Sequence, residues 1–205
     1  MSFEANTVVF TIGHSNHTLQ DLVANLRLHG VTAVADIRSS PYSRANPQFN
    51  RESFRKSLKA NGVAYVFLGN ELGGRPNDQS YYVDGRVQYH EIAKSEFFKE
   101  GLDRVRKGAR SHKVTLLCSE AEPLACHRTI LVAQELTTQG IAVVHIHANG
   151  KTESHAEAMT RLINTLGLSH QDLYRTKEQI IADACAIQGT RIAYVSGETC
   201  EKASA

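Results

Sequence analysis

The segment 114–136, VTLLCSEAEPLACHRTILVAQEL, decides the fold class that this sequence predicts. It begins with an apolar run, residues 114–117, that is typical of a buried strand. It ends with an amphipathic run, residues 129–136, that is typical of a helix. This order places Cys118 at the carboxyl end of a strand and Cys126 at the start of a helix. Open parallel sheets bind their ligands at that edge, so the segment predicts where chemistry takes place without naming the reaction.

The alternation of strand and helix continues along the chain in both directions. We expect strands at residues 7–12, 31–37, 63–68, 113–117 and 141–146, and helices within 18–30, 50–62, 95–106, 126–138, 153–166 and 171–187. Residues 69–85 form a long, turn-rich segment, which is typical of a lid or a binding loop. Residues 191–195 are expected to form a last short strand, and residues 198–205 to be loose.

The predicted fold class is α/β, because strands that alternate with helices imply right-handed crossovers and a mainly parallel, doubly wound sheet. The 205 residues suit a single domain. Residues 1–150 carry the candidate site, and residues 151–205 form a helical C-terminal extension that is expected to pack on the same domain. The sequence has no apolar run of about 18 residues and no secretory signal, so we expect a cytoplasmic protein without a membrane span. Its four cysteines are then not a disulfide framework, and its net charge of +2 selects no partner and no oligomeric state.

Four motifs lie in the loops that follow the predicted strands. They are Thr11-Ile12-Gly13-His14-Ser15; Asp36-Ile37-Arg38-Ser39-Ser40-Pro41 with Ser43-Arg44 and Pro47-Gln48-Phe49; Leu72-Gly73-Gly74; and Cys118-x-Glu120-x-x-Pro123-x-x-Cys126-His127-Arg128. In this order they resemble the bacterial family known as domain of unknown function 488, over residues 8–147. The resemblance implies an α/β fold and a shared pocket, but no settled reaction.

Thiol chemistry is the first interpretation of these motifs. A helix start favours thiolate over thiol, so Cys126 is a candidate nucleophile or redox thiol and Cys118 its partner. His14 and His127 are candidates for proton transfer, and Glu120 for a base or for a tie to an arginine. The alternative is that both cysteines only pack as small hydrophobic residues.

Metal binding is the second interpretation. His14, Cys118, Cys126 and His127 supply the nitrogen and sulfur ligands that zinc or iron prefers. Two adjacent residues of a regular helix do not easily face one ion, which counts against Cys126 and His127 acting together. No resident cofactor is therefore predicted, and zinc or iron stays an alternative.

Anion binding is the third interpretation, because guanidinium groups suit phosphate and carboxylate. The candidate residues are Arg38, Arg44, Arg75 and Arg128, with Ser15, Gly73 and Gly74 in the same loops. The alternative is that these arginines pair with Asp36, Glu71 or Glu120 and only hold the loops together. Three functions follow: an enzyme that acts by thiol chemistry on a phosphate-containing or nucleotide-like substrate, a nucleic-acid-binding module, and a metalloprotein.

Overall fold

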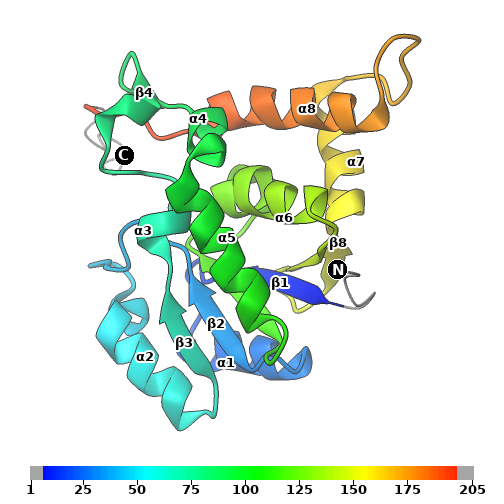
Figure 1. Ribbon diagram of the computed structural model, residues 1–205. Helices are drawn as coiled ribbons and strands as arrows, with labels where there is room; N and C mark the ends of the chain where they lie inside the picture. The colour runs from blue at the N-terminus through cyan, green and yellow to red at the C-terminus, as the bar shows by residue number, and fades with distance from the viewer. Residues whose placement is uncertain (1–6, 198–205) are drawn as a thin grey trace, which may run out of the picture.

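A computed structural model describes residues 7–197 and has a six-stranded sheet at its centre (Figure 1). The strands are β1 (Val8–Gly13), β2 (Ala33–Asp36), β3 (Ala64–Phe67), β6 (Val114–Cys118), β7 (Ala142–Ile146) and β8 (Thr152–Ser154). They lie in the order β3-β2-β6-β1-β7-β8, and every neighbouring pair is parallel except β7 with β8. The predicted α/β class with a mainly parallel sheet is therefore confirmed.

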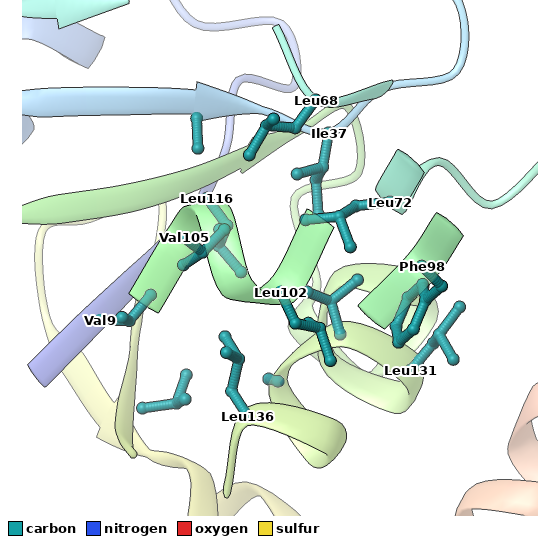
Figure 2. Close-up of a cluster of buried hydrophobic side chains, with 14 of the residues drawn as sticks. Val9, Ile37, Leu68, Leu72, Phe98, Leu102, Val105, Leu116, Leu131 and Leu136 are labelled. Atoms are coloured by element: carbon teal, nitrogen blue, oxygen red, sulfur yellow. The ribbon is translucent and has the colours of Figure 1, made fainter. Parts of the chain in front are cut away.

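Helices cover both faces of this sheet. The helices α1 (Leu19–Leu28) and α2 (Arg51–Ala60) bury apolar side chains in one cluster with Ile12 and Leu117. The helices α5 (Glu96–Gly108) and α6 (Gln134–Thr138) pack in a second cluster with Leu116. Figure 2 shows this second cluster, in which side chains of α5 and α6 point toward those of the sheet. Ile12, Leu117 and Leu116 show how alternate strand residues serve opposite faces.

Helix ends follow local signals in the sequence. The Thr18 side chain accepts a hydrogen bond from the Asp21 N–H at 3.1 Å and so caps α1. Gly30 follows this helix with a φ of 64°, a conformation that favours glycine. Asn50 precedes α2 as predicted, but its side chain accepts from the Ser43 N–H at 2.7 Å instead of from α2. Asn50 therefore fastens the loop before α2.

Residues 69–85 are not the continuous loop that the sequence predicted. They contain the short helix α3 (Gly69–Leu72), the 3₁₀ turn η2 (Gln79–Tyr81) and the strand β4 (Tyr82–Val83). β4 pairs with β5 (Arg86–Val87), and α4 (Tyr89–Lys94) follows. Elements of two to six residues are too short to give a readable hydrophobic period, so the sequence pattern missed them.

The predicted strand at residues 191–195 is also wrong. The helix α8 (Lys177–Ile192) continues into this segment, and only Val195 forms an isolated bridge, with Arg86. A capping box between Thr176 and Gln179 starts α8 six residues later than the pattern indicated. The expected looseness of residues 198–205 lies outside the described residues. Within residues 7–197, no helix is long and apolar enough to cross a bilayer.

Residues 152–192 pack directly on the segment that follows β6. β8 extends the sheet, and α7 (His155–Leu166) and α8 share an apolar cluster with Leu124 and Ile130. Figure 1 shows α8 lying across one end of the molecule, above α6. The Gln188 amide donates a hydrogen bond to the Leu124 carbonyl at 2.9 Å. These contacts fix Leu124 and Ile130, which lie on either side of the segment 125–129.

Candidate functional site

At the end of β6, the chain connections of neighbouring strands pass to opposite faces of the sheet. β1 and β2 flank β6, and their following helices cover one face, whereas the helix after β6 covers the other face. Gly13 is level with Cys118, and Asp36 with Leu117, so three strand ends meet at one edge. Such a position is called a topological switch point, and open α/β sheets usually bind their ligands there.

Four side chains of the β6 loop converge at this edge, and we call them the thiol cluster: Cys118, Glu120, Cys126 and His127. The Sγ atoms of Cys118 and Cys126 each lie 3.0 Å from the same Glu120 carboxylate oxygen. The same sulfurs lie 3.7 and 3.9 Å from Nδ1 of His127. Both cysteines and His127 are buried, whereas Glu120 is exposed overall and only its carboxylate turns inward. Glu120 is therefore the member of the cluster that lies nearest the protein surface.

The backbone at Cys126 explains how two adjacent residues face one point. The 3₁₀ turn η3 (Pro123–Ala125) ends at Cys126, whose φ of −139° and ψ of 140° are extended. The helix begins only at the next residue, His127, and continues as a buried π-helical segment, η4 (Arg128–Ala133). The objection drawn from a regular helix therefore does not apply here. π-Helical turns are rare and frequently occur at functional sites.

His127 has a fixed ring orientation. Its Nε2 lies 3.2 Å from the Ile37 carbonyl oxygen, which can only accept a hydrogen bond, so Nε2 carries the proton in the neutral ring. Nδ1 is then the free nitrogen, and it faces both sulfurs. A Cβ atom on Gly74 would lie 2.8 Å from Cγ of His127, so this glycine leaves the space that the ring occupies.

Two of the predicted anion-binding arginines, Arg38 and Arg128, form hydrogen bonds with other groups of the protein. Arg38 is buried and binds the Asp36 carboxylate through Nε at 2.8 Å and Nη2 at 2.6 Å. Arg128 is fully buried, and its Nη1 and Nη2 donate to the carbonyls of Glu120 and Ala121 at 2.5 and 3.0 Å. Arg128 thereby shapes the loop that carries Glu120. The Glu120 carboxylate binds thiols and not an arginine.

The other predicted binding residues lie further out. Arg44 is exposed, and its side chain has no hydrogen-bond or ion-pair partner within residues 7–197. Arg75 is also exposed, and its guanidinium lies 4.6 Å from the centre of the Tyr194 ring. A Cβ on Gly73 would meet the Gly69 carbonyl at 2.3 Å, so this glycine permits a close backbone approach. The structure brings neither Arg44 nor Arg75 into hydrogen-bonding contact with the thiol cluster.

His14 lies on the opposite face of the sheet from the thiol cluster. Its ring stacks on Phe49 at 4.5 Å, in the apolar cluster that α1 and α2 cover. Nδ1 of His14 lies 2.8 Å from the Ser15 carbonyl, and Ser15 has a positive φ of 45°. His14 is therefore not among the described residues whose atoms converge for a metal ion, which are Cys118, Cys126 and His127.

His145 and His147, at the end of β7, both have hydrogen-bonding partners. Nδ1 of His145 lies 2.8 Å from the Thr11 hydroxyl, and its Nε2 lies 3.1 Å from Nδ1 of His155. Nε2 of His155 lies 3.0 Å from Gln134 Oε1, which completes a chain of four buried or partly buried side chains. His147 pairs with Glu153 at 3.1 Å.

Burial and close contacts shift the acidity of the cluster. Burial raises the pKa of the Cys118 thiol well above its usual range, and the hydrogen bond to Cys126 adds to this shift. Burial opposes ionisation of Cys126, but the hydrogen bond from Cys118 and the charge of Arg128 hold its pKa well below the usual range. Burial, and then Cys126, raise the pKa of Glu120. Burial opposes protonation of His127, but Cys126 raises its pKa. The pKa shifts of Cys126 and His127 thus both favour the charged form of the side chain.

Three groups near the two faces of this edge are not among the candidate site residues that the sequence indicated. The Ile37 carbonyl orients His127, and a backbone oxygen gives no signal in a residue pattern. The Tyr65 hydroxyl donates to Asp36 at 2.8 Å. Burial raises the pKa of Tyr89, and the nearby Cys126, Cys118 and Glu120 raise it further, so this ring belongs to the surroundings of the cluster. Tyr65 and Tyr89 lie in a strand and a short helix, and only packing brings them here.

The sequence profile described as Domain of unknown function DUF488 matches residues 18–135, which is more than half of the 205 residues. The chain belongs to this family. The match includes the DUF488 motifs at Asp36 and Cys118 and begins after the one at Thr11–Ser15. A comparison with curated proteins gives no match. The DUF488 family name states no reaction, so the function has to be argued from the site.

Proposed function

We propose that this DUF488 protein is a metalloprotein that holds one zinc or iron ion between Cys118, Cys126 and His127. One observation carries this proposal: the free Nδ1 of His127 faces both cysteine sulfurs, at 3.7 and 3.9 Å. Three electron-pair donors thereby aim at a common point. Two sulfurs and one imidazole nitrogen form a donor set that binds zinc or iron in other proteins.

The distances agree with tetrahedral coordination. Zinc lies about 2.3 Å from sulfur and about 2.0–2.1 Å from nitrogen, so a tetrahedral ion separates a sulfur from a nitrogen by roughly 3.5 Å. The observed separations exceed this value by only a few tenths of an ångström. Nδ1 and both sulfurs lie within 4.8 Å of one another. Small side-chain rotations would therefore bring all three atoms into bonding range.

The surroundings of the cluster fit the second layer of a metal site. Metal-bound histidines usually donate their other N–H to a carbonyl or carboxylate, as His127 does toward Ile37. The Arg128 N–H lies 3.4 Å from the Cys126 sulfur, and its guanidinium fixes the loop between the two cysteines. Such contacts would stabilise the negative charge of two thiolates.

The fourth coordination position of a bound ion, which no cysteine or histidine of the cluster would occupy, supports a catalytic role. Three protein ligands leave one position for water, which a bound ion makes more acidic. The Glu120 carboxylate lies against both sulfurs, so it is positioned to accept and return a proton there. Zinc deaminases use the same combination of two thiolates, one imidazole and a glutamate that is not a ligand. We therefore expect water activation and not electron transfer.

Metal analysis of the purified protein tests this proposal. Elemental analysis should find about one zinc or iron per chain in the wild type and far less in Cys126→Ser. Cys185→Ser is the matched control, because Cys185 is also buried but contacts Met159 and not the thiol cluster. Loss of metal in the control, or wild-type protein that neither contains nor takes up either metal, would contradict the proposal.

Metal-free thiol chemistry on an anionic substrate is the second candidate function. Its specific support is the pair of sulfurs that share one carboxylate oxygen at 3.0 Å, with Glu120 open to solvent. In that case, iodoacetamide should modify Cys126 at the same rapid rate with and without added zinc. Protection by added zinc would favour the metal site. Nucleic-acid binding stays a prediction that no specific contact favours.

A further inference from the structure

The strand β3 forms one outer edge of the sheet, and half of its backbone groups have no partner in the protein (Figure 1). The N–H groups of Ala64 and Leu68 donate to carbonyl groups on the β2 side, at 2.9 and 2.8 Å. Directions alternate along a strand, so Tyr65 and Phe67 turn their N–H and C=O groups away from β2. These groups make no hydrogen bond within residues 7–197. Such an edge can pair with an added strand.

A cavity of about 270 Å³ lies beside this edge, on the face of the sheet that α5 covers. Its walls are mainly apolar and include Ala33 and Ala35 from β2, Ala64 and Val66 from β3, and Val105 from α5. Ala64 and Val66 are exposed, Val66 to 39%, so no helix covers this part of β3. An apolar side chain of a ligand would therefore find a pocket next to unpaired backbone groups.

Cationic side chains flank this edge on both faces of the sheet. Residues 51–60, which form α2 on one face, include four Lys or Arg and one Glu. Residues 104–113, which include the end of α5 on the other face, contain five Lys or Arg and no acidic residue. The whole chain has a net charge of only +2, so its positive charge is concentrated around β3. This distribution favours an acidic partner.

The protein itself neutralises only part of this charge. Arg104, at the rim of the cavity, pairs with Glu71, and Arg106 pairs with Asp103. Five exposed cations have no ion-pair partner within residues 7–197: Arg55, Lys56, Lys59, Lys107 and Arg110. Acidic side chains of a partner could pair with these five without breaking an existing contact.

The same charges argue against a second copy of this chain at the edge. The guanidinium of Arg51 lies 4.5 Å from the centre of the Phe67 ring, so α2 is close to β3. Pairing of two β3 strands about a twofold axis would therefore bring two cationic α2 helices near each other. Charged residues protect strand edges from self-association in this way, but they do not oppose an acidic strand.

A nucleic acid would match the charge but not the cavity. Single strands bind largely by stacking their bases on aromatic rings. Among the described residues that line the cavity, Tyr65 alone is aromatic, and its ring packs on the opposite face, where it donates to Asp36. An apolar pocket beside open backbone groups instead fits an extended peptide, whose alternate side chains point to one face.

We propose that the β3 edge binds an extended, acidic peptide segment of another protein as an additional strand. The backbone groups of Tyr65 and Phe67 pair with the segment. One of its apolar side chains enters the cavity beside Val66, and its acidic side chains contact α2 and the end of α5. This surface shares no residue with the thiol cluster and does not require a metal ion.

Fluorescence anisotropy with labelled probes tests this inference. The first probe is a short peptide in which glutamate alternates with valine or leucine, and we expect it to bind. Two further probes are the same peptide N-methylated at alternate residues, in either of the two phases. Only one phase faces β3, so one should bind about tenfold more weakly and the other as the parent does. A thymidine oligonucleotide of equal charge should bind more weakly than the parent peptide.

A variant and its control place the peptide at the cavity. Val66→Glu should weaken binding of the acidic peptide about tenfold, because it puts a like charge beside the bound segment. Val83→Glu is the matched control, since Val83 is also an exposed strand valine, at 57%, but lies in β4. In wild-type protein, the amide hydrogens of Tyr65 and Phe67 should exchange more slowly when the peptide is present, which requires no variant.

Four results would overturn the inference: equal binding of the two N-methylated peptides, equal or tighter binding of the oligonucleotide, equal binding by folded Val66→Glu, or unchanged exchange at Tyr65 and Phe67. A dimer that protects these two amides without peptide would also overturn it, in favour of a second copy. None of these outcomes bears on the metal content of the thiol cluster, which is measured separately.

Discussion

Two buried polar clusters on the same face of the sheet differ in how their atoms are paired. In the histidine chain, formed by Thr11, His145, His155 and Gln134, each nitrogen of the two rings has one partner, at 2.8, 3.1 and 3.0 Å. Donors and acceptors alternate along this chain, so it is complete. In the thiol cluster, two sulfurs, a carboxylate oxygen and a ring nitrogen converge, and each sulfur contacts both the carboxylate and the ring.

This difference separates a structural polar cluster from a binding one. A chain in which every group is paired rigidifies the protein and offers nothing to a ligand. Convergent lone pairs repel one another unless protons or a cation lie between them. Burial alone therefore does not identify a site, since both clusters are buried, but the balance of donors and acceptors does.

Metal addition should give the largest contrast between the two clusters. At a free metal concentration of about 1,000 times the dissociation constant, a ligand that binds only the folded state stabilises it by about 4 kcal/mol. We expect this gain for the wild type and for His145→Gln, and no gain for Cys118→Ser. Urea denaturation with and without zinc measures it. An equal gain in all three proteins would place the ion elsewhere.

Removal of one member of the histidine chain should cost more folding stability than removal of a cysteine. His145→Leu leaves the Thr11 hydroxyl and Nδ1 of His155 without partners, and two unsatisfied buried groups cost about 3 kcal/mol. Cys118→Ser in the presence of a chelator should cost less than this. Urea midpoints of the two variants provide the comparison. The reverse order would mean that the thiol cluster, and not the histidine chain, supports the fold.

Acid should act on the histidine chain in the absence of metal. Burial lowers the pKa of His155 to about 4 and that of His145 to about 2. Unfolded histidines take up protons near pH 6.5. The free energy of unfolding is therefore not reduced by these rings above pH 6.5, and it decreases as the pH falls toward 4.

The size of this loss is about 2 kcal/mol for each ring between pH 6.5 and 5. Urea midpoints measured across this range with a chelator should fall in the wild type and fall less steeply in His155→Gln. His90→Gln is a suitable control, because His90 is exposed. If His155→Gln loses stability with the same slope as the wild type, His155 does not stay neutral in the folded protein.

The smallest effect is expected from a single methyl group beside the thiol cluster. Gly74→Ala would place a Cβ 2.8 Å from the His127 ring and push the ring from its position. A displaced ligand should weaken metal binding about tenfold, as changes in the second layer of metal sites do. Competition with a chromophoric chelator measures this affinity. Gly108→Ala is the matched control, because its Cβ would meet Val114 at an ordinary 3.7 Å.

The sequence predicted secondary structure correctly wherever the residues of one short segment are enough to indicate a strand or a helix. The apolar run before Cys118, the helical repeat after Thr18 and the glycine at position 30 predicted strand and helix, because burial and capping depend on neighbours in the chain. The same patterns placed Cys118 at a strand end, where the structure has it. They failed at residues 69–85 and 191–195, where the elements are too short, or too dependent on packing, to show a period.

What the sequence by itself determined is thus the α/β sheet, the family and the edge at which polar residues gather. The tertiary structure alone decided how those residues are paired: Arg38 with Asp36, Arg128 with two carbonyls, and His127 with Ile37 and the thiols. It also assigned His14 and Cys118 to opposite faces. The physical reason is that secondary structure follows from local spacing. Hydrogen-bond pairing depends on distances between residues far apart in the chain, and on backbone atoms that no residue pattern reveals.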